Sequence, residues 1–329
     1  MRRGNMLLCT AAALLASACE RGPADPEPSP ASASATLNAL GGFSAWSAAV
    51  GAEVALSGAD ASFNTPSLDG CPFTSRDGRS FYMASNRPGG LGGIDIWVST
   101  RTRTDEPWGP PVNVGAPVNS DVDDFCPTLD RDGHRFFFVS RRVVDGACGG
   151  SDIYVSRLRG NGTYDQPENL GCEVNSAFDE ASPFPLPQAG GSPVLYFSST
   201  RPGLGAGGDL YVSEWGGSSY GSPTLVPGVN GPFDDGQPNV RRDGLELFFY
   251  STRPDADALG GPDIYAATRA STRDPWSTPV NLGPAVNSSA GETRPSLSWD
   301  GTTLYFGSAR PGGEGVSDIY VSTRAKLHP

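Results

Sequence analysis

The stretch TRPSLSWDGTTLYFGSARPGGEGVSDIYVSTR, residues 293–324, decides the fold, because related segments occur four more times upstream. The first of them is CPFTSRDGRSFYMASNRPGGLGGIDIWVSTR, residues 71–101. A proline anchors each copy, at positions 72, 127, 183, 238 and 295, so the successive steps are 55, 56, 55 and 57 residues. Periods of this size are typical of propellers and solenoids.

The pattern of each copy predicts short strands that are separated by turns and glycine-rich loops. In the last copy we expect a first strand at Pro295–Ser298 and a second at Leu304–Phe306. Asp300 and Gly301 between them form a tight hairpin turn, where glycine supplies the positive φ. After a glycine-rich loop, Asp318–Ser322 makes a third strand. The pattern is that of an antiparallel meander.

A fourth strand follows in the earlier copies. Trp108–Val114 and Trp276–Leu282 each combine Trp, Pro and Val, and their prolines suit an outer edge strand, where a missing N–H faces solvent. Four antiparallel strands per repeat make a propeller blade. The 43 Gly and 30 Pro of the 329 residues agree with such a turn-rich, all-β chain.

The last copy reaches the end of the sequence without an outer strand. Phe43–Val50 resembles that strand and has no repeat in front of it. We therefore predict that the N-terminal strand completes the last blade, which closes the ring and removes a free sheet edge. The expected architecture is a five-bladed β-propeller with four antiparallel strands per blade, forming a single domain over residues 41–329.

The N-terminus predicts export. Arg2 and Arg3 precede an apolar stretch and a run of small residues, the order of a secretory signal over residues 1–18. Leu15–Cys19 resembles the lipobox of bacterial lipoproteins, which implies a lipidated Cys19, whereas an ordinary soluble secretory signal is the alternative. Residues 19–40 are rich in Pro, Ala and Ser and read as a tether. Glu20 replaces the aspartate that retains such proteins at the inner membrane, so we expect an outer-membrane lipoprotein, periplasmic or surface-exposed.

Charge limits the partners. The net charge is −12, and loss of residues 1–18 removes two arginines and no acid, which leaves 22 basic against 36 acidic side chains, or −14. This balance disfavours nucleic acid and anionic lipid, since both require clustered Lys and Arg. We expect a monomer that contacts the membrane only through the lipid, with an envelope protein or a glycan as its partner.

The motifs P-x-x-S-x-D-G, S-x-R-P-G-G and D-I-Y-V-S resemble the WD40-like β-propeller repeat of the TolB type, found in many bacterial envelope lipoproteins. The resemblance covers about residues 40–329. It departs from TolB itself, whose propeller has six blades and is joined to an α/β domain, so the partners of TolB are not transferred to this chain.

Two kinds of charged residue recur in every copy on what strand alternation makes one face of the ring. We interpret them as ion pairs and turn caps that clamp loops between neighbouring blades, where the planar guanidinium fits a carboxylate. A charged funnel that binds a ligand or cation on the axis is the alternative. The arginines are Arg87, Arg142, Arg201, Arg253 and Arg310, and the acids are Asp69, Asp124, Glu180, Asp235 and Glu292.

The residue just before each anchoring proline differs between copies and should point near the channel mouth. Of these, Ser182, Gln237 and Arg294 are candidate ligand-facing residues, and the other two are cysteines. In an exported protein four cysteines suggest two disulfides, with three pairings possible. From their positions in the repeat we predict one bond between Cys71 and Cys126 and one between Cys148 and Cys172.

The sequence favours a non-catalytic function. Five-bladed propellers also house glycosidases, which use two or three axial carboxylates in unequal surroundings. Here the recurring acids are equivalent, and the only histidines are His134 and His328. We therefore predict a lipid-anchored binding or scaffold module that presents its loops to a protein or glycan, without catalytic residues, metal or cofactor. A glycoside hydrolase-like enzyme with axial carboxylates is the alternative.

Overall fold

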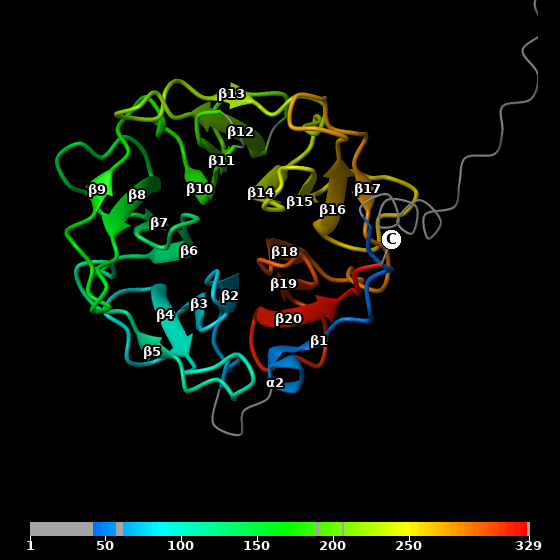
Figure 1. Cartoon of the computed structure of the whole chain (residues 1–329), viewed down its shortest axis with the longest axis horizontal. Coiled ribbons are helices and arrows are strands. Elements are labelled where there is room, and N and C mark those ends of the chain that lie inside the picture. Colours follow the sequence, from blue (N-terminus) through cyan, green and yellow to red (C-terminus); the bar gives the residue numbers. More distant parts are fainter. Residues whose placement is uncertain (1–41, 57–61, 189–190, 206, 328–329) are drawn as a thin grey trace, which may run out of the picture.

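The chain folds into a ring of five antiparallel sheets. A computed structural model describes residues 42–56, 62–188, 191–205 and 207–327. These residues form five sheets of four strands each around a central axis, as Figure 1 shows face-on. A single helical turn, α2 (Ala52–Ala55), is the one helix of the described residues. The predicted all-β, five-bladed propeller is confirmed.

Each blade runs from an inner strand at the axis to an outer strand at the rim. Blade 1 comprises β2 (Asp69–Thr74), β3 (Ser80–Ser85), β4 (Asp95–Thr100) and β5 (Val112–Asn113). Blade 2 comprises β6 (Asp124–Leu129), β7 (Arg135–Ser140), β8 (Asp152–Arg157) and β9 (Glu168–Asn169). Blade 3 comprises β10 (Glu180–Leu186), β11 (Val194–Ser199), β12 (Asp209–Glu214) and β13 (Thr224–Leu225). Blade 4 comprises β14 (Asp235–Val240), β15 (Glu246–Ser251), β16 (Asp263–Thr268) and β17 (Val280–Asn281). Blade 5 comprises β18 (Glu292–Leu297), β19 (Thr303–Ser308), β20 (Asp318–Thr323) and β1 (Val50–Gly51).

The ring closes through the N-terminal segment, as predicted. β1 pairs antiparallel with β20 and takes the outer position of blade 5, beside the red strand β20 (Figure 1). Ahead of it, Phe43 forms a β-bridge with Lys326, and Trp46 packs in the core between blades 4 and 5. The first and last parts of the chain thus share one sheet, which leaves blade 5 complete.

The outer strands are shorter than the sequence suggested, with two residues each. In blade 1 only Val112 and Asn113 of the expected Trp108–Val114 pair with β4, because the preceding Pro110 and Pro111 have no N–H to donate. Trp108 itself turns inward and is 4 % exposed. The tryptophans of these segments therefore belong to the core rather than to the sheet edge.

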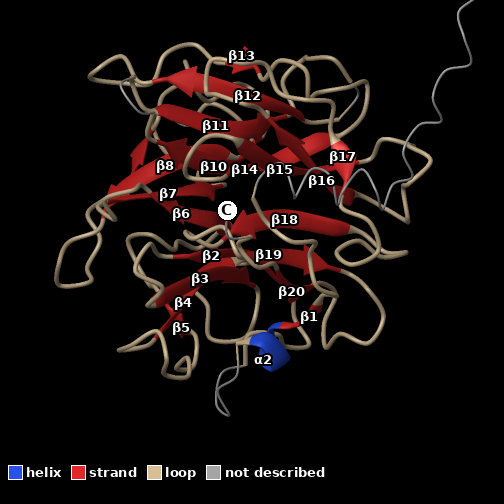
Figure 2. Ribbon diagram, turned by 45° about the vertical axis from the view of Figure 1, so that its right-hand side comes forward, coloured by secondary structure: helices blue, strands red, loops and turns tan. Residues whose placement is uncertain are grey.

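The hydrophobic core is divided into layers that lie between adjacent sheets. Figure 2 shows the strands of the sheets that enclose these layers. Between blades 3 and 4, Leu210 of β12 packs in one cluster with Phe249 of β15. Between blades 4 and 5, Phe248 and Phe306 share a second cluster with Trp46. Consecutive residues of one strand, such as Phe248 and Phe249, thus pack in two different layers, because successive side chains of a strand point to opposite faces of the sheet.

Candidate functional site

The five recurring acids and arginines are called the clamp acids and the clamp arginines below. The clamp acids occupy the first position of each inner strand, and their side chains have no exposed surface. We call the side of the ring where the inner strands begin the entry face. Every clamp acid forms an ion pair with the predicted arginine of its own blade. The N–O distances are 2.6 Å for Arg87–Asp69, 2.7 Å for Arg142–Asp124, 3.0 Å for Arg201–Glu180, 2.8 Å for Arg253–Asp235 and 3.2 Å for Arg310–Glu292.

The guanidinium groups of the clamp arginines make further hydrogen bonds and aromatic contacts, as Arg253 illustrates. Arg253 also donates from Nη2 to the carbonyl of Val229, in the loop that enters blade 4, and from Nε to Oγ of Ser251. Its guanidinium stacks on Tyr265 at 5.0 Å. Each ion pair joins two strands of one blade, because the arginine follows two residues after the strand that pairs with the strand of the acid. Both partners also bind the loop that arrives from the preceding blade: the carbonyl of Val229 accepts from Arg253, and the N–H of Gly231 donates to Asp235.

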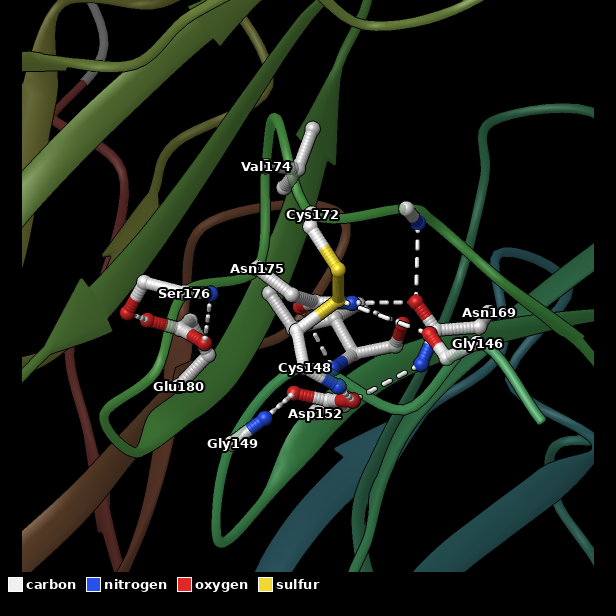
Figure 3. The surroundings of a disulfide bond; sticks show 12 residues. Gly146, Cys148, Gly149, Asp152, Asn169, Cys172, Val174, Asn175, Ser176 and Glu180 are labelled. Atoms are coloured by element: carbon white, nitrogen blue, oxygen red, sulfur yellow. Dashed lines mark hydrogen bonds between the residues drawn. A yellow bond between two sulfur atoms is a disulfide. The ribbon is translucent and has the colours of Figure 1, made fainter. Parts of the chain in front are cut away.

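The aspartates that begin the third strand of each blade cap the glycine-rich loops. Asp152 accepts hydrogen bonds from the backbone N–H groups of Cys148 and Gly149 and from the side chain of Asn169 (Figure 3). In blades 3, 4 and 5 burial raises the pKa of the equivalent Asp209, Asp263 and Asp318 above the usual aspartate value. These carboxylates therefore stabilise loops and are covered by them.

The structure joins Cys71 to Cys126 and Cys148 to Cys172, the same pairs that the sequence suggested. The first bond links the inner strands of blades 1 and 2. The second links the loop before β8 to the loop after β9, both in blade 2, as Figure 3 shows. Both bonds lie on the entry face, and the first one forms part of the axial wall.

The five residues that precede the anchoring prolines form a ring around the axis. Each inner strand has a β-bulge at this point, and each of the five residues has a positive φ although none is glycine. Together with the five prolines they line an axial pocket of about 40 Å³. Pockets for drug-sized ligands have volumes of roughly 300 Å³ or more. A sugar would therefore have to bind above this pocket, on the entry face. The ring consists of Cys71, Cys126, Ser182, Gln237 and Arg294.

Three acids that the sequence analysis did not consider break the symmetry of the entry face. Asp123, Asp179 and Asp234 each directly precede the clamp acid of blades 2, 3 and 4. The equivalent residues of blades 1 and 5 are Leu68 and Gly291. The signal was present in the sequence as acid pairs, Asp-Asp or Asp-Glu, in three of the five repeats. It identifies one half of the ring as chemically distinct.

The surroundings of these three acids differ. Nη1 of Arg141 lies 3.2 Å from Oδ2 of Asp123, so this carboxylate faces a cation. The hydroxyl of Tyr250 donates to Oδ1 of Asp234 at 3.1 Å, and burial raises the pKa of this tyrosine. Asp179 is exposed and accepts a hydrogen bond from Oγ of Ser151. Three carboxylates in adjacent blades thus face a guanidinium, a phenol and an aliphatic hydroxyl.

Some of the sequence-based predictions concern residues or ligands that the structure does not test. Cys19, the signal over residues 1–18 and the tether over residues 19–40 lie outside the described residues. Within the part of the chain that the structure describes, no group of three or more His, Cys, Asp or Glu side chains could hold a metal ion. None of its helices is long and apolar enough to cross a membrane.

Comparison by sequence finds no relative. No protein-family model matches the chain, and no curated protein matches its sequence.

Comparison by structure finds proteins with a similar fold. An α-L-arabinofuranosidase from Lactobacillus brevis aligns with 80 % of this chain and 92 % of its own, at 13 % identity and a TM-score of 0.53. An exo-1,5-α-L-arabinanase from a bovine ruminal metagenomic library aligns with 81 % of this chain and 100 % of its own, at 13 % identity and a TM-score of 0.51. A TolB from Agrobacterium tumefaciens aligns with 74 % of this chain and 71 % of its own, at 16 % identity and a TM-score of 0.44, too low to support an argument. At these identities the likeness establishes the class of fold, the five-bladed β-propeller.

The prediction of a non-catalytic scaffold is wrong. Two solved structures that share this ring at a TM-score above 0.5 are glycan-cleaving enzymes by name, in line with the alternative stated above. The recurring acids are equivalent because they are the buried clamps, whereas Asp123, Asp179 and Asp234 have unequal partners.

Proposed function

We propose that this protein is a glycoside hydrolase-like enzyme whose reaction takes place on the entry face, over blades 2 to 4. The observation that carries the proposal is the trio Asp123, Asp179 and Asp234, three carboxylates in adjacent blades with unequal partners. Glycoside hydrolysis uses one carboxylic acid to protonate the leaving oxygen and a second carboxylate to activate water or to attack the sugar. Unequal surroundings are what allow two carboxylates to take these two roles.

The partners of the three acids suggest how the roles are divided. We assign proton transfer to Asp179, because it is exposed and pairs with no cation among the described residues. Asp123, which forms an ion pair with Arg141, is the anionic partner. Asp234 is held by Tyr250 and by the N–H of Gly208, and it positions the substrate between the other two. The small axial pocket beneath does not admit a sugar ring, so the substrate lies across the face.

Arabinose-containing glycans are the first substrates to test, since the structural neighbours include an arabinofuranosidase and an arabinanase. The measurement is release of reducing sugar from arabinan and of 4-nitrophenol from the aryl α-L-arabinofuranoside. Loss of a general acid or base lowers rates by roughly 10²–10⁴-fold, so Asp179→Asn should lower kcat by at least 100-fold. Asp132→Asn is the matched control, because Asp132 is an exposed acid next to the β6–β7 hairpin turn on the opposite face.

Two results would contradict this proposal, one for the three acids and one for the enzyme activity as a whole. Full activity of Asp179→Asn, with Asp123→Asn and Asp234→Asn also active, would remove the trio from the mechanism. Absence of any hydrolysis across a panel of arabinan, xylan and aryl glycosides by the wild-type protein would overturn the proposal itself.

We also propose that the enzyme belongs to the WD40-like repeat proteins of the TolB type and is anchored in the outer membrane through Cys19. The support comes from the repeat motifs, the lipobox-like Leu15–Cys19 and the tether over residues 19–40. Metabolic labelling with an alkynyl fatty acid should mark the wild-type chain and leave Cys19→Ser unmarked. Labelling of both chains, or of neither, would contradict the lipid anchor.

A further inference from the structure

Arg294 is a cation at the axis for which the described residues provide no partner. Its backbone N–H donates to Oε1 of Gln237 at 2.7 Å, which fixes the residue in the axial ring. Its guanidinium forms no ion pair and donates no hydrogen bond within the described residues, and its Nε is shielded from solvent. Desolvation lowers the pKa of the Arg294 side chain, and only the Tyr250 hydroxyl opposes this. Five N–H donors and one positive charge are thus left without a protein acceptor.

The clamp arginines show how this fold treats a partly buried guanidinium when it serves structure alone. Arg310 has a carboxylate, a backbone carbonyl and an aromatic ring around it: Glu292 at 3.2 Å, Val286 at 2.6 Å and Tyr320 at 4.5 Å. Buried charges are paired because a buried unpaired ion is costly to desolvate. Arg294 is also partly buried, with its Nε shielded from solvent, and it has none of these three kinds of partner among the described residues, so its charge calls for an acceptor from solution.

A glycine in the neighbouring blade 1 makes room for the guanidinium of Arg294. A Cβ atom at Gly70 of β2 would lie 2.6 Å from Nη1 of Arg294, so the guanidinium occupies the place of a side chain in blade 1. The equivalent residues of blades 2, 3 and 5 are Phe125, Ala181 and Thr293, which carry Cβ atoms. Gly70 therefore lets Arg294 cross from blade 5 to blade 1 and lie over the axial pocket. A surface arginine would need no such gap.

The pocket that Arg294 lines is small. Its volume is about 40 Å³, enough for a few water molecules at the roughly 10–15 Å³ that each needs in a cavity. Ser182, Gln237 and the disulfide between Cys71 and Cys126 complete the ring of which Arg294 is the one charged member. A monatomic anion fits this volume, whereas a sugar or an oligopeptide does not.

We infer that the axial pocket binds a small inorganic anion of chloride size, held by the guanidinium of Arg294. The anion accepts hydrogen bonds from guanidinium N–H groups that the protein leaves unpaired. It also neutralises the charge of Arg294 at the point where the five inner strands meet. It would thereby stabilise the closure between blades 5 and 1. This site is separate from the carboxylate trio, so its existence does not depend on the proposed enzyme activity.

Thermal unfolding of the full chain in sodium chloride and in sodium gluconate at equal ionic strength tests the site. Gluconate is too large for the pocket, and equal ionic strength removes general screening. A ligand that binds only the folded state raises Tm with its concentration, and roughly 2–4 °C is expected for an excess of about tenfold over Kd. Arg294→Gln should abolish the difference between the two salts. Arg242→Gln, an exposed arginine on the opposite face, should retain it.

A direct measurement complements the unfolding curves. Crystals grown in sodium bromide should show an anomalous peak beside the guanidinium of Arg294 in the wild-type protein and none in Arg294→Gln. Should Arg294→Gln fail to fold, Arg294→Lys keeps the charge and loses the planar fork, and a weaker chloride response is expected of it. Equal Tm of the wild-type protein in chloride and gluconate, an unchanged response in Arg294→Gln, or no bromide peak at the axis would each overturn the inference.

Discussion

Arg324 and Glu246 form a fully buried, two-point ion pair that joins the last strand of the propeller to blade 4. Nη1 and Nη2 of Arg324 lie 2.8 Å and 2.6 Å from the two carboxylate oxygens, and the two side chains are 0 % and 1 % exposed. The same guanidinium stacks on Phe43 at 3.9 Å and on Trp46 at 4.4 Å. One side chain thus connects the C-terminal strand, the N-terminal segment and the adjacent blade. It holds the closing blade in place.

Removing this guanidinium should open the closure. Arg324→Ala leaves Glu246 with Arg241 alone, whose Nη1 lies 2.9 Å from Oε2. We expect the lower end of the cost of breaking a buried ion pair, about 3 kcal/mol, and a Tm lower by roughly 5–10 °C. The measurement is thermal unfolding followed by circular dichroism. Arg103→Ala is the control, because the Arg103–Asp105 pair is exposed on both sides and its loss should leave Tm unchanged. Equal Tm values for the two variants would show that Arg324 is not needed for closure.

A clamp arginine should act on stability rather than on binding. Arg201 bonds Glu180, the carbonyl of Val174 and Oγ of Ser199, and it stacks on Tyr211. Because the carboxylate of Glu180 has no exposed surface, Arg201→Ala leaves it buried without a cation, at a cost of about 3 kcal/mol. Denaturant unfolding gives this value directly. Unchanged stability combined with lost ligand binding would reassign the clamps to a binding site.

The second disulfide should contribute stability by restricting the unfolded chain. Cys148 and Cys172 are 24 residues apart, and a cross-link of this span is worth about 3 kcal/mol by loop-closure entropy. The double variant Cys148→Ser and Cys172→Ser should therefore unfold at a lower urea concentration than the wild-type protein. Its activity on glycans should persist, because the partners of the three proposed acids in the described residues are Arg141, Ser151 and Tyr250 rather than either cysteine, and the bond lies beside the loop that Asp152 caps (Figure 3). A midpoint equal to that of the wild-type protein would show that the loops are held by their hydrogen bonds alone.

Asp263 should make stability depend on pH in the unusual direction. Burial raises the folded-state pKa of Asp263 above the unfolded value, and its Oδ1 has no hydrogen-bond partner among the described residues. The protonated form is therefore favoured in the folded state, so this contribution to stability is present below the unfolded pKa, near 3.8, and is lost as pH rises through the folded pKa. Asp263→Asn keeps an acceptor for the N–H of Leu259 and carries no charge.

The experiment compares urea unfolding of the wild-type protein and Asp263→Asn at pH 4, 5.5 and 7. The stability of the variant relative to the wild-type protein should rise with pH. Asp243→Asn is an exposed control for the effect of removing one negative charge. A constant difference between wild type and Asp263→Asn across this range would contradict the assignment.

The sequence predicted the repeating parts of the structure better than the parts that differ. The blade closure by Phe43–Val50 and the pairing of Arg253 with Asp235 follow from what all five copies share. The course of the Arg294 side chain does not follow, because it depends on a bulge in β18 and on the absence of a Cβ at Gly70, which lies in the adjacent blade of the closed ring but more than 220 residues away along the chain. A residue is placed by such a contact only after the ring has closed.

The candidate site was missed for a related reason. Asp123 stands next to the recurring Asp124, and a comparison that looks for what is common assigns importance to the clamp and none to its neighbour. The deviation was legible as an acid pair in three consecutive repeats. Its chemistry, however, depends on Arg141 and Tyr250, which lie 18 and 16 residues further along the chain from their partners.

Adding a single methyl group at Gly70 should displace the axial arginine. The new Cβ would lie 2.6 Å from Nη1 and 3.5 Å from Cδ of Arg294, so the guanidinium must leave its place over the pocket. Overpacking of this kind costs about 1–3 kcal/mol, which should lower Tm. Gly160→Ala is the matched control, because its Cβ would meet no atom within 4 Å. If Gly70→Ala unfolds at the temperature of Gly160→Ala and keeps the same difference between chloride and gluconate, Arg294 does not depend on the gap in blade 1.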